Sequence, residues 1–172
     1  MPEHAPRTER HAPGPQAGRP AEGGLVMAFD FGTRRIGVAI GETRLGLARA
    51  LTTLDVEANV ARFAAIARLI AEWQPARLLV GHPFNDDGTA HEMTARCERF
   101  ANQLGGRFVL PVELIDERFS SLEAESALRQ RRVSWQERKT RIDAEAARII
   151  LQGWFDARAA HSSTPLEIHA AA

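Results

Sequence analysis

The sequence has one cysteine, one lysine and no long apolar run, and each shortage excludes a class of protein. Cys97 alone cannot form a disulfide within the chain, which indicates a reducing compartment and predicts a cytoplasmic protein. No apolar stretch is long enough to cross a membrane, and the N-terminus lacks the apolar segment of a signal peptide. Arginine supplies the positive charge apart from Lys139, and the formal net charge is zero, so any surface for nucleic acid must be local.

Both ends of the chain differ in composition from its middle. Residues 1–24 contain five of the nine prolines and no large apolar residue after Met1, which predicts a disordered tail. Residues 158–172 are rich in alanine, serine and histidine and predict a second flexible tail. Residues 25–157 are enough for one domain with a buried core.

Hydrophobic periodicity between the tails predicts an α/β domain. Three strands joined by short turns come first, and helices then alternate with strands, which indicates a mixed sheet with an antiparallel meander and parallel strands. Gly105 and Gly106 are expected to end the second helix, and Val60 and Ile142 are expected to face the core. The expected strands are 25–31, 36–40, 45–51, 77–80 and 108–115, and the expected helices are 56–73, 89–104, 120–129 and 142–155.

The first predicted strand carries an acid at a position that should be buried. Asp30 stands in the apolar run, and Gly32 follows at the turn into the second strand. An aspartate there is costly to bury unless it is paired or holds a metal ion, and the glycine lets a phosphate or another backbone come close. An aspartate that caps its own turn would give the same pattern, so both interpretations stay open.

Further carboxylates interrupt the hydrophobic pattern. Asp116 and Glu117 end a strand, and the carboxyl ends of parallel strands usually form the site of an α/β protein. Asp143 lies in the first turn of the last predicted helix, above the apolar positions Ala147 and Ile150. Separate acids from two strands and a helix suit Mg²⁺ or Mn²⁺, which take oxygen ligands and support phosphodiester hydrolysis. Spacing alone leaves open whether these acids converge.

Four segments resemble, in the same order, the motifs of the YqgF family of Holliday-junction-resolvase-like nucleases, which are also called pre-16S rRNA nucleases. The first resembles D-x-G-x-K-R-I-G-V-A, with Arg34 at the lysine position. The second resembles V-G-x-P closing on D-G, the third D-E-R-[LF]-[ST]-[ST], and the fourth the helix D-x-x-A-A-x-x-I-L-Q. The segments are DFGTRRIGVA at 30–39, VGHPFNDDG at 80–88, DERFSS at 116–121 and IDAEAARIILQ at 142–152.

The resemblance implies an RNase H-like fold, with helices on both faces of the mixed sheet, and a metal-dependent nuclease acting in rRNA processing. It implies that Asp30, Glu117 and Asp143 are catalytic and bind Mg²⁺ or Mn²⁺, with Asp116 as a weaker fourth ligand. It also implies substrate contacts, with two arginines facing phosphates and a loop lining the site. These residues are Arg35 and Arg118, and His82 and Gly88 of the loop.

Residues 129–141 form a basic segment with Trp135 in its middle. Arg131 and Arg132 would contact phosphates and the tryptophan would stack on a base, although a solvated loop with one anchoring tryptophan has the same composition. The expected partner is structured RNA, with pre-16S rRNA in pre-ribosomal particles as the preferred substrate and branched DNA as the alternative.

Two other classes of function remain to be distinguished from a nuclease. A non-catalytic RNA-binding assembly or transcription factor could use the same fold, although retention of all three acids argues against it. A sugar-kinase or actin-type phosphotransferase has a similar D-x-G-T loop, matched here by 30–33, but needs a second large domain for which this chain has no room.

Overall fold

The computed structural model of the chain describes residues 23–83, 90, 92–117 and 135–162, with 135–141 described through the backbone alone. The helix predicted over 120–129 lies outside the described residues. Within the described part, no helix has the length and apolar character needed to cross a membrane. The elements are β1 (Leu25–Phe31), β2 (Arg35–Glu42), β3 (Leu47–Asp55), α1 (Asn59–Trp73), β4 (Arg77–His82), α2 (Glu92–Phe108), β5 (Val112–Asp116) and α4 (Trp135–Ser162).

The strands form one mixed sheet in the order β3-β2-β1-β4-β5. β1, β2 and β3 are an antiparallel meander, whereas β4 pairs in parallel with both β1 and β5. β1 is therefore the central strand. Because β1, β4 and β5 run parallel, their C-terminal ends lie together at one end of the sheet. The predicted combination of meander and parallel strands is confirmed.

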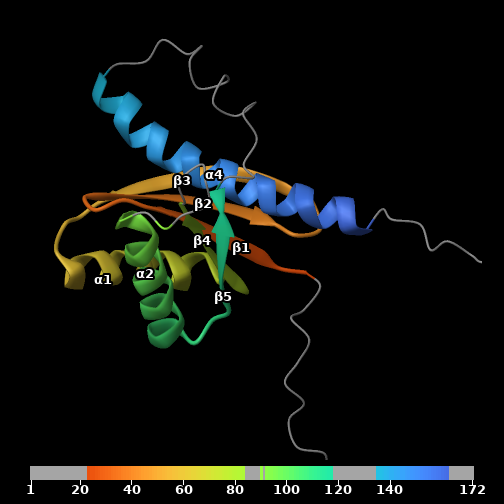
Figure 1. Cartoon of the computed structure of the whole chain (residues 1–172), viewed down its shortest axis with the longest axis horizontal. Helices are drawn as coiled ribbons and strands as arrows, with labels where there is room; N and C mark the ends of the chain where they lie inside the picture. Colours follow the sequence, from red (N-terminus) through yellow and green to blue (C-terminus); the bar gives the residue numbers. More distant parts are fainter. Residues whose placement is uncertain (1–22, 84–89, 91, 118–134, 163–172) are drawn as a thin grey trace, which may run out of the picture.

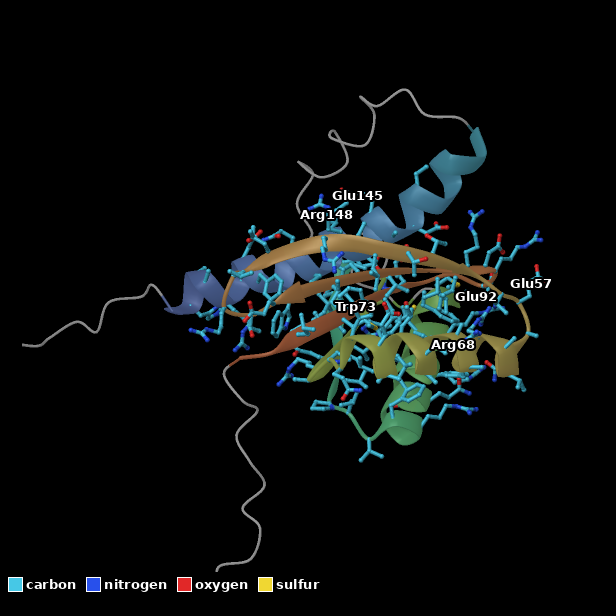
Figure 2. The ribbon with its side chains drawn as sticks, turned by 180° about the vertical axis from the view of Figure 1, so that it is seen from behind. Glu57, Arg68, Trp73, Glu92, Glu145 and Arg148 are labelled. Carbon is cyan, nitrogen blue, oxygen red and sulfur yellow. The ribbon has the colours of Figure 1, made fainter. Side chains whose placement is uncertain are left out.

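Helices cover both faces of the sheet, as Figure 1 shows with α4 on one side and α1 and α2 on the other. Figure 2 places Glu145 and Arg148 of α4 and Arg68 of α1 on these opposite sides. Alternate side chains of β1 supply the two cores: Met27 packs with α1 and α2, and Ala28 packs with α4. This alternation is what a central strand buried on both faces requires.

The second helix does not end at its glycines, as the sequence predicted. α2 continues through Gly105 and Gly106 to Phe108, and Val109 then takes a left-handed φ of 54°. Glycines cost roughly 1 kcal/mol each in a helix interior. Here the extra turn brings Phe108 against the core next to the fully buried Leu104, and this burial outweighs the propensity.

Several predicted boundaries and core positions were also wrong. β3 starts at Leu47 and runs to Asp55, because pairing with β2 carries the strand through its polar residues. Val60 is 86% exposed and Ile142 is 45% exposed, since each helix turns a neighbouring stripe of residues to the sheet. α4 runs from Trp135 to Ser162, so the first five residues of the tail predicted at 158–172 are helical.

Candidate functional site

Asp30 lies near the end of β1 on the side of the sheet that faces α4. Val26 and Ala28 pack against α4, while Met27 and Phe29 pack against the other helices. Side chains alternate along a strand, so Asp30 points toward α4 with Val26 and Ala28. Its carboxylate therefore lies in a layer that is otherwise apolar.

Asp143 comes to the same place from α4. Asp30 pairs across the strands with Gly37 of β2. A Cβ atom at Gly37 would overlap the backbone carbonyl of Asp143 and would lie 2.9 Å from the backbone nitrogen of Ala144. Because Gly37 has no side chain, α4 lies directly against β2 and Asp143 lies beside Asp30.

Glu117 follows β5 and reaches this face over a second glycine. A Cβ atom at Gly81 of β4 would overlap Oε1 of Glu117 and would lie 2.7 Å from Cδ1 of Ile150 on α4. The carboxylate of Glu117 therefore packs over the end of β4, between the sheet and α4. The structure thus gathers Asp30, Glu117 and Asp143 at the same edge of the sheet.

Burial and mutual repulsion change the acidity of two of these carboxyl groups. Burial, followed by the charge of Asp143, raises the pKa of Asp30 to about 6. Burial, followed by the charges of Asp30 and Asp116, raises the pKa of Glu117 to about 7. The two groups are coupled, because a negative charge on Asp30 opposes ionisation of Glu117. Both therefore ionise at a higher pH than ordinary carboxyl groups do.

Asp143 has a counter-ion of its own. Nε of Arg35 donates a hydrogen bond to Oδ2 of Asp143 at 2.7 Å, within a half-buried ion pair. The sequence predicted that Arg35 would face phosphates, and in the structure its Nε is engaged by this carboxylate. The two residues are 108 positions apart, so their pairing depends on the packing of α4 against β2.

His82 and Asp116 lie on the opposite face of the sheet from Asp30. They are paired across β4 and β5, and Nε2 of His82 is 3.0 Å from Oε1 of Glu98 on α2. Val112, two strand periods before Asp116, packs into the core on the α2 side. Strand alternation therefore directs Asp116 away from Asp30 and Asp143. Asp116 influences Glu117 through its charge rather than as a fourth member of one cluster.

The resemblance implies a divalent cation, and the carboxylates described above are its candidate ligands. Among the residues that the structure describes, no three acidic, histidine or cysteine side chains form a group that could hold one metal ion. Asp143 is engaged by Arg35, and Asp30 and Glu117 are half-buried carboxylates close enough for the charge of Asp30 to raise the pKa of Glu117. Such a pair fits Mg²⁺, which commonly takes one or two carboxylates and keeps several waters. The arrangement suits a two-carboxylate site, and the predicted set of four ligands is not assembled.

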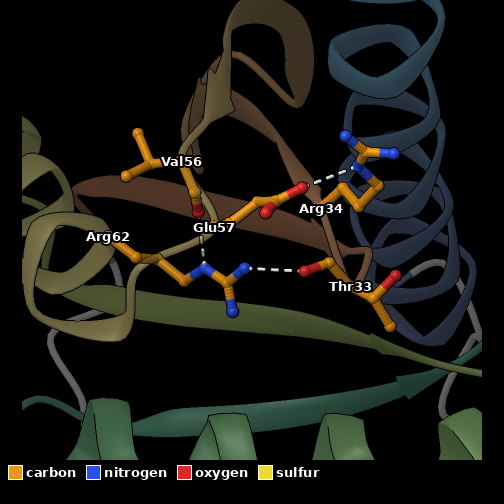
Figure 3. Close-up of polar contacts among 5 residues, drawn as sticks. All are labelled: Thr33, Arg34, Val56, Glu57 and Arg62. Atoms are coloured by element: carbon orange, nitrogen blue, oxygen red, sulfur yellow. Dashed lines mark hydrogen bonds and ion pairs between the residues drawn. The ribbon is translucent and has the colours of Figure 1, made fainter.

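The turn between β1 and β2 is held by contacts that sequence reasoning missed. Arg62 of α1 is buried, with Nη2 donating to the carbonyl of Thr33 at 2.8 Å and Nε donating to the carbonyl of Val56 at 3.2 Å. Arg34 pairs with Glu57 at 2.8 Å on the surface beside them (Figure 3). Arg62 thus fixes the turn that follows Asp30. The glycines at 37 and 81 were also missed, although isolated glycines within apolar strands are a signal of close approach.

Some predicted site residues fall outside the described residues. These are Arg118, Gly88, Arg131 and Arg132, and the side chain of Trp135 is likewise not described. Their roles in substrate binding stay predictions.

Comparison with known proteins agrees with this fold. Residues 24–157 match the family described as "RuvX: Holliday junction resolvase". A Methylobacillus flagellatus protein named "Putative pre-16S rRNA nuclease" is 54% identical over 133 residues, covering 77% of this chain and 91% of its own. A Burkholderia vietnamiensis protein of the same name is 48% identical over 145 residues, covering 84% of this chain and 97% of its own.

A solved structure resembles the chain in fold. "T. thermophilus RuvC in complex with Holliday junction substrate" matches with a TM-score of 0.50 and 17% identity, over 78% of this chain and 95% of that one. This likeness, together with the mixed sheet and the helices on both faces, shows that the fold is RNase H-like. With the sequence match over residues 24–157, the chain belongs to the RuvX family of nucleases, the YqgF family that its four motifs resemble.

Proposed function

We propose that this protein is a divalent-cation-dependent endonuclease that processes the 5′ end of pre-16S rRNA in ribosome biogenesis. The half-buried carboxylates Asp30, near the end of β1, and Glu117, just after β5, carry the proposal, because they lie close enough for the charge of Asp30 to raise the pKa of Glu117. Two neighbouring carboxylates with raised pKa values suit a site that holds a cation. The substrate is suggested by the names of relatives that are 54% and 48% identical. Such a function places the protein in the cytoplasm, with pre-ribosomal RNA as its partner.

Asp30 and Glu117 would hold the cation, with Asp143 beside Asp30. When bound, Mg²⁺ or Mn²⁺ supplies positive charge that activates water and stabilises the oxygens of a phosphodiester. Asp30 and Glu117 must both be ionised to serve as ligands, so the proton that Glu117 carries below about pH 7 competes with cation binding. Arg35 orients Asp143 through Nε, and its Nη groups are suited to donate to a phosphate.

The direct test is cleavage of end-labelled pre-16S leader RNA by the purified full-length protein in Mg²⁺, Mn²⁺ or EDTA. Asp30→Asn and Glu117→Gln should each lower the cleavage rate by orders of magnitude, while changing RNA affinity little or raising it slightly as negative charge leaves. Glu72→Gln is a matched control, because Glu72 is an exposed carboxylate on α1, across the sheet from the site. Equal cleavage by wild type and both site variants would refute the assignment.

A four-way DNA junction is the second candidate substrate, favoured by the description of the matching family as a Holliday junction resolvase. The same assay with a labelled junction separates the two substrates. If wild type binds RNA tightly but cuts neither substrate with Mg²⁺ or Mn²⁺, the assembly-factor alternative replaces the nuclease. The phosphotransferase alternative is set aside, because the family match spans residues 24–157.

A further inference from the structure

A cavity of about 600 Å³ lies at the N-terminal ends of β1 and β4, at the opposite end of these strands from the carboxylates. It is bounded by the start of β1, the turn between β2 and β3, the start of β4 and the C-terminal part of α4. Figure 1 shows the start of β1 and the end of α4 on the same side of the molecule. A volume of this size is in the range of pockets that bind small organic groups.

The cavity has an excess of positive charge. Three arginines line it, and none of the described lining residues is acidic; the arginines are Arg44, Arg77 and Arg158. Arg77 is neutralised in part by Glu113, whose Oε2 accepts from Nη1 of Arg77 at 3.1 Å. The other oxygen of Glu113 accepts from Nε1 of Trp154 at 3.2 Å, so that carboxylate is engaged on both sides. Arg44 and Arg158 add further positive charge to the lining, which favours an anionic ligand.

The lining of the cavity also contains a cation–π pair, Arg158 with Trp154. The guanidinium of Arg158 lies over the ring of Trp154, with its central carbon 4.6 Å from the ring centroid. Trp154 is itself buried beside Phe155, with their ring centroids 5.4 Å apart. Contact with a buried indole restrains the guanidinium group, and arginine guanidinium groups are known to stack on unpaired nucleic-acid bases.

The walls of the cavity are fixed by hydrogen bonds between elements. The carbonyl of Gly24 accepts from both the backbone nitrogen and Oγ1 of Thr43, at 3.1 and 3.0 Å. Gln152 of α4 donates through Nε2 to the carbonyl of Gly46 and accepts through Oε1 from the backbone of Ala48, each at 3.0 Å. These contacts join the start of β1 and the turn after β2 to their neighbours, so the cavity is a preformed part of the fold.

We propose that this cavity binds one nucleotide of a single-stranded RNA segment, with Arg44 and Arg158 on its phosphate and the Arg158 plane against its base. The inference rests on the proposed function, since it assigns a second contact to the same substrate. Arg158 is fifteen residues beyond Asp143 on α4, which is about 22 Å along the helix at about 1.5 Å per residue. The cavity would thus bind the RNA at a distance from the carboxylates and set which part of the RNA reaches them.

The test measures binding of a short, unstructured, fluorescently labelled RNA to the full-length protein by anisotropy in EDTA, across a range of salt concentrations. Arg44→Ala with Arg158→Ala should weaken binding roughly tenfold and make the slope of log K against log salt shallower by about 0.7, the value for one phosphate that is no longer neutralised. Both arginines are exposed, so the variant should fold.

The matched control is Arg49→Ala with Arg68→Ala on the α1 side of the sheet. Arg49 lies over Trp73 at 4.8 Å, as Arg158 lies over Trp154, and Arg68 is exposed like Arg44. The control should keep wild-type affinity and salt slope. Addition of 5′-AMP as competitor should displace the RNA from wild type only at high concentration, since the free nucleotide lacks the rest of the strand.

Wild-type affinity and slope in the Arg44 and Arg158 variant would overturn the inference, and so would equal losses in both double variants. The inference would also be overturned if wild type binds 5′-AMP in the cavity while the Arg44 and Arg158 variant binds RNA normally. The ligand of the cavity would then be a free nucleotide. Because these measurements need no cleavage, they separate this inference from the proposed function: a protein that cuts no RNA can still bind RNA at the cavity, and an active nuclease can lack this contact.

Discussion

Replacing Asp30 by asparagine should stabilise the cation-free protein in a pH-dependent way. Burial and the charge of Asp143 raise the pKa of Asp30 from 3.8 to about 6, so the folded state binds its proton more tightly than the unfolded chain does. For an acid whose pKa is raised on folding, ionisation costs stability as pH rises through the interval between the two pKa values. Above that interval the cost is complete, at about 1.4 kcal/mol for each pKa unit.

The shift of Asp30 by about two units predicts a cost of about 3 kcal/mol to the free energy of unfolding at pH 8. Near pH 4.5 the cost falls to about 1 kcal/mol, because the folded carboxyl is then protonated. Asp30→Asn keeps a similar shape without the charge. In EDTA it should therefore stabilise the protein most at pH 8, with the gain shrinking by about 2 kcal/mol toward pH 4.5.

Urea unfolding of wild type and variant at both pH values measures this difference, and the background change of groups that do not interact with Asp30 cancels in the comparison. Glu72→Gln should show little change at either pH, because that carboxylate is exposed. A loss of stability on Asp30→Asn that is equal at the two pH values would refute the electrostatic reasoning. It would show instead that the Asp30 carboxylate is a structural cap of the turn before Gly32.

Two further predictions concern the cation and the glycine under α4. Mn²⁺ should raise the melting temperature of wild type more at pH 8 than at pH 6, because Glu117, with a pKa of about 7, must be ionised to bind the cation. Thermal scans of Glu117→Gln should show no rise on adding Mn²⁺. Gly37→Ala should lower the free energy of unfolding by about 1–3 kcal/mol or more, since its Cβ overlaps the backbone of Asp143. Gly153→Ala is the control, because its Cβ would meet nothing within 4 Å. Urea unfolding of this variant should show a free energy of unfolding higher by about 0.5–1 kcal/mol. A higher free energy of unfolding for Gly37→Ala as well would contradict the packing argument.

The sequence predicted the central hairpin and the nature of the sheet because these depend on local patterns. An apolar strand, a turn at Gly32 and a second apolar strand become β1 and β2 with nearly the expected bounds. The limits of α2 could not be predicted in this way. Its glycines are stop signals locally, but the burial of Phe108 depends on β5 and the rest of the core, which lie elsewhere in the chain.

The site was predictable as a set of residues but not as an arrangement. The apolar neighbours of Asp143 at Ala147 and Ile150 correctly indicated that it borders the buried face of α4. Its pairing with Arg35 could not be read from spacing, because it arises where α4 crosses β2 at Gly37. The same crossing explains why Arg35, expected to face phosphates, is held within the protein.

The distribution of charge at the site distinguishes hydrolysis from simple RNA binding. A surface that only holds phosphates gains from arginines and loses from carboxylates, because carboxylates repel the backbone of RNA. Among the residues that the structure describes, Arg35 pairs with Asp143, and the half-burial of Asp30 and Glu117 makes their ionisation costly. A divalent cation removes that cost and at the same time makes the site attractive to a phosphodiester. These half-buried carboxylates therefore fit the proposed cation-dependent nuclease better than a protein that only binds RNA.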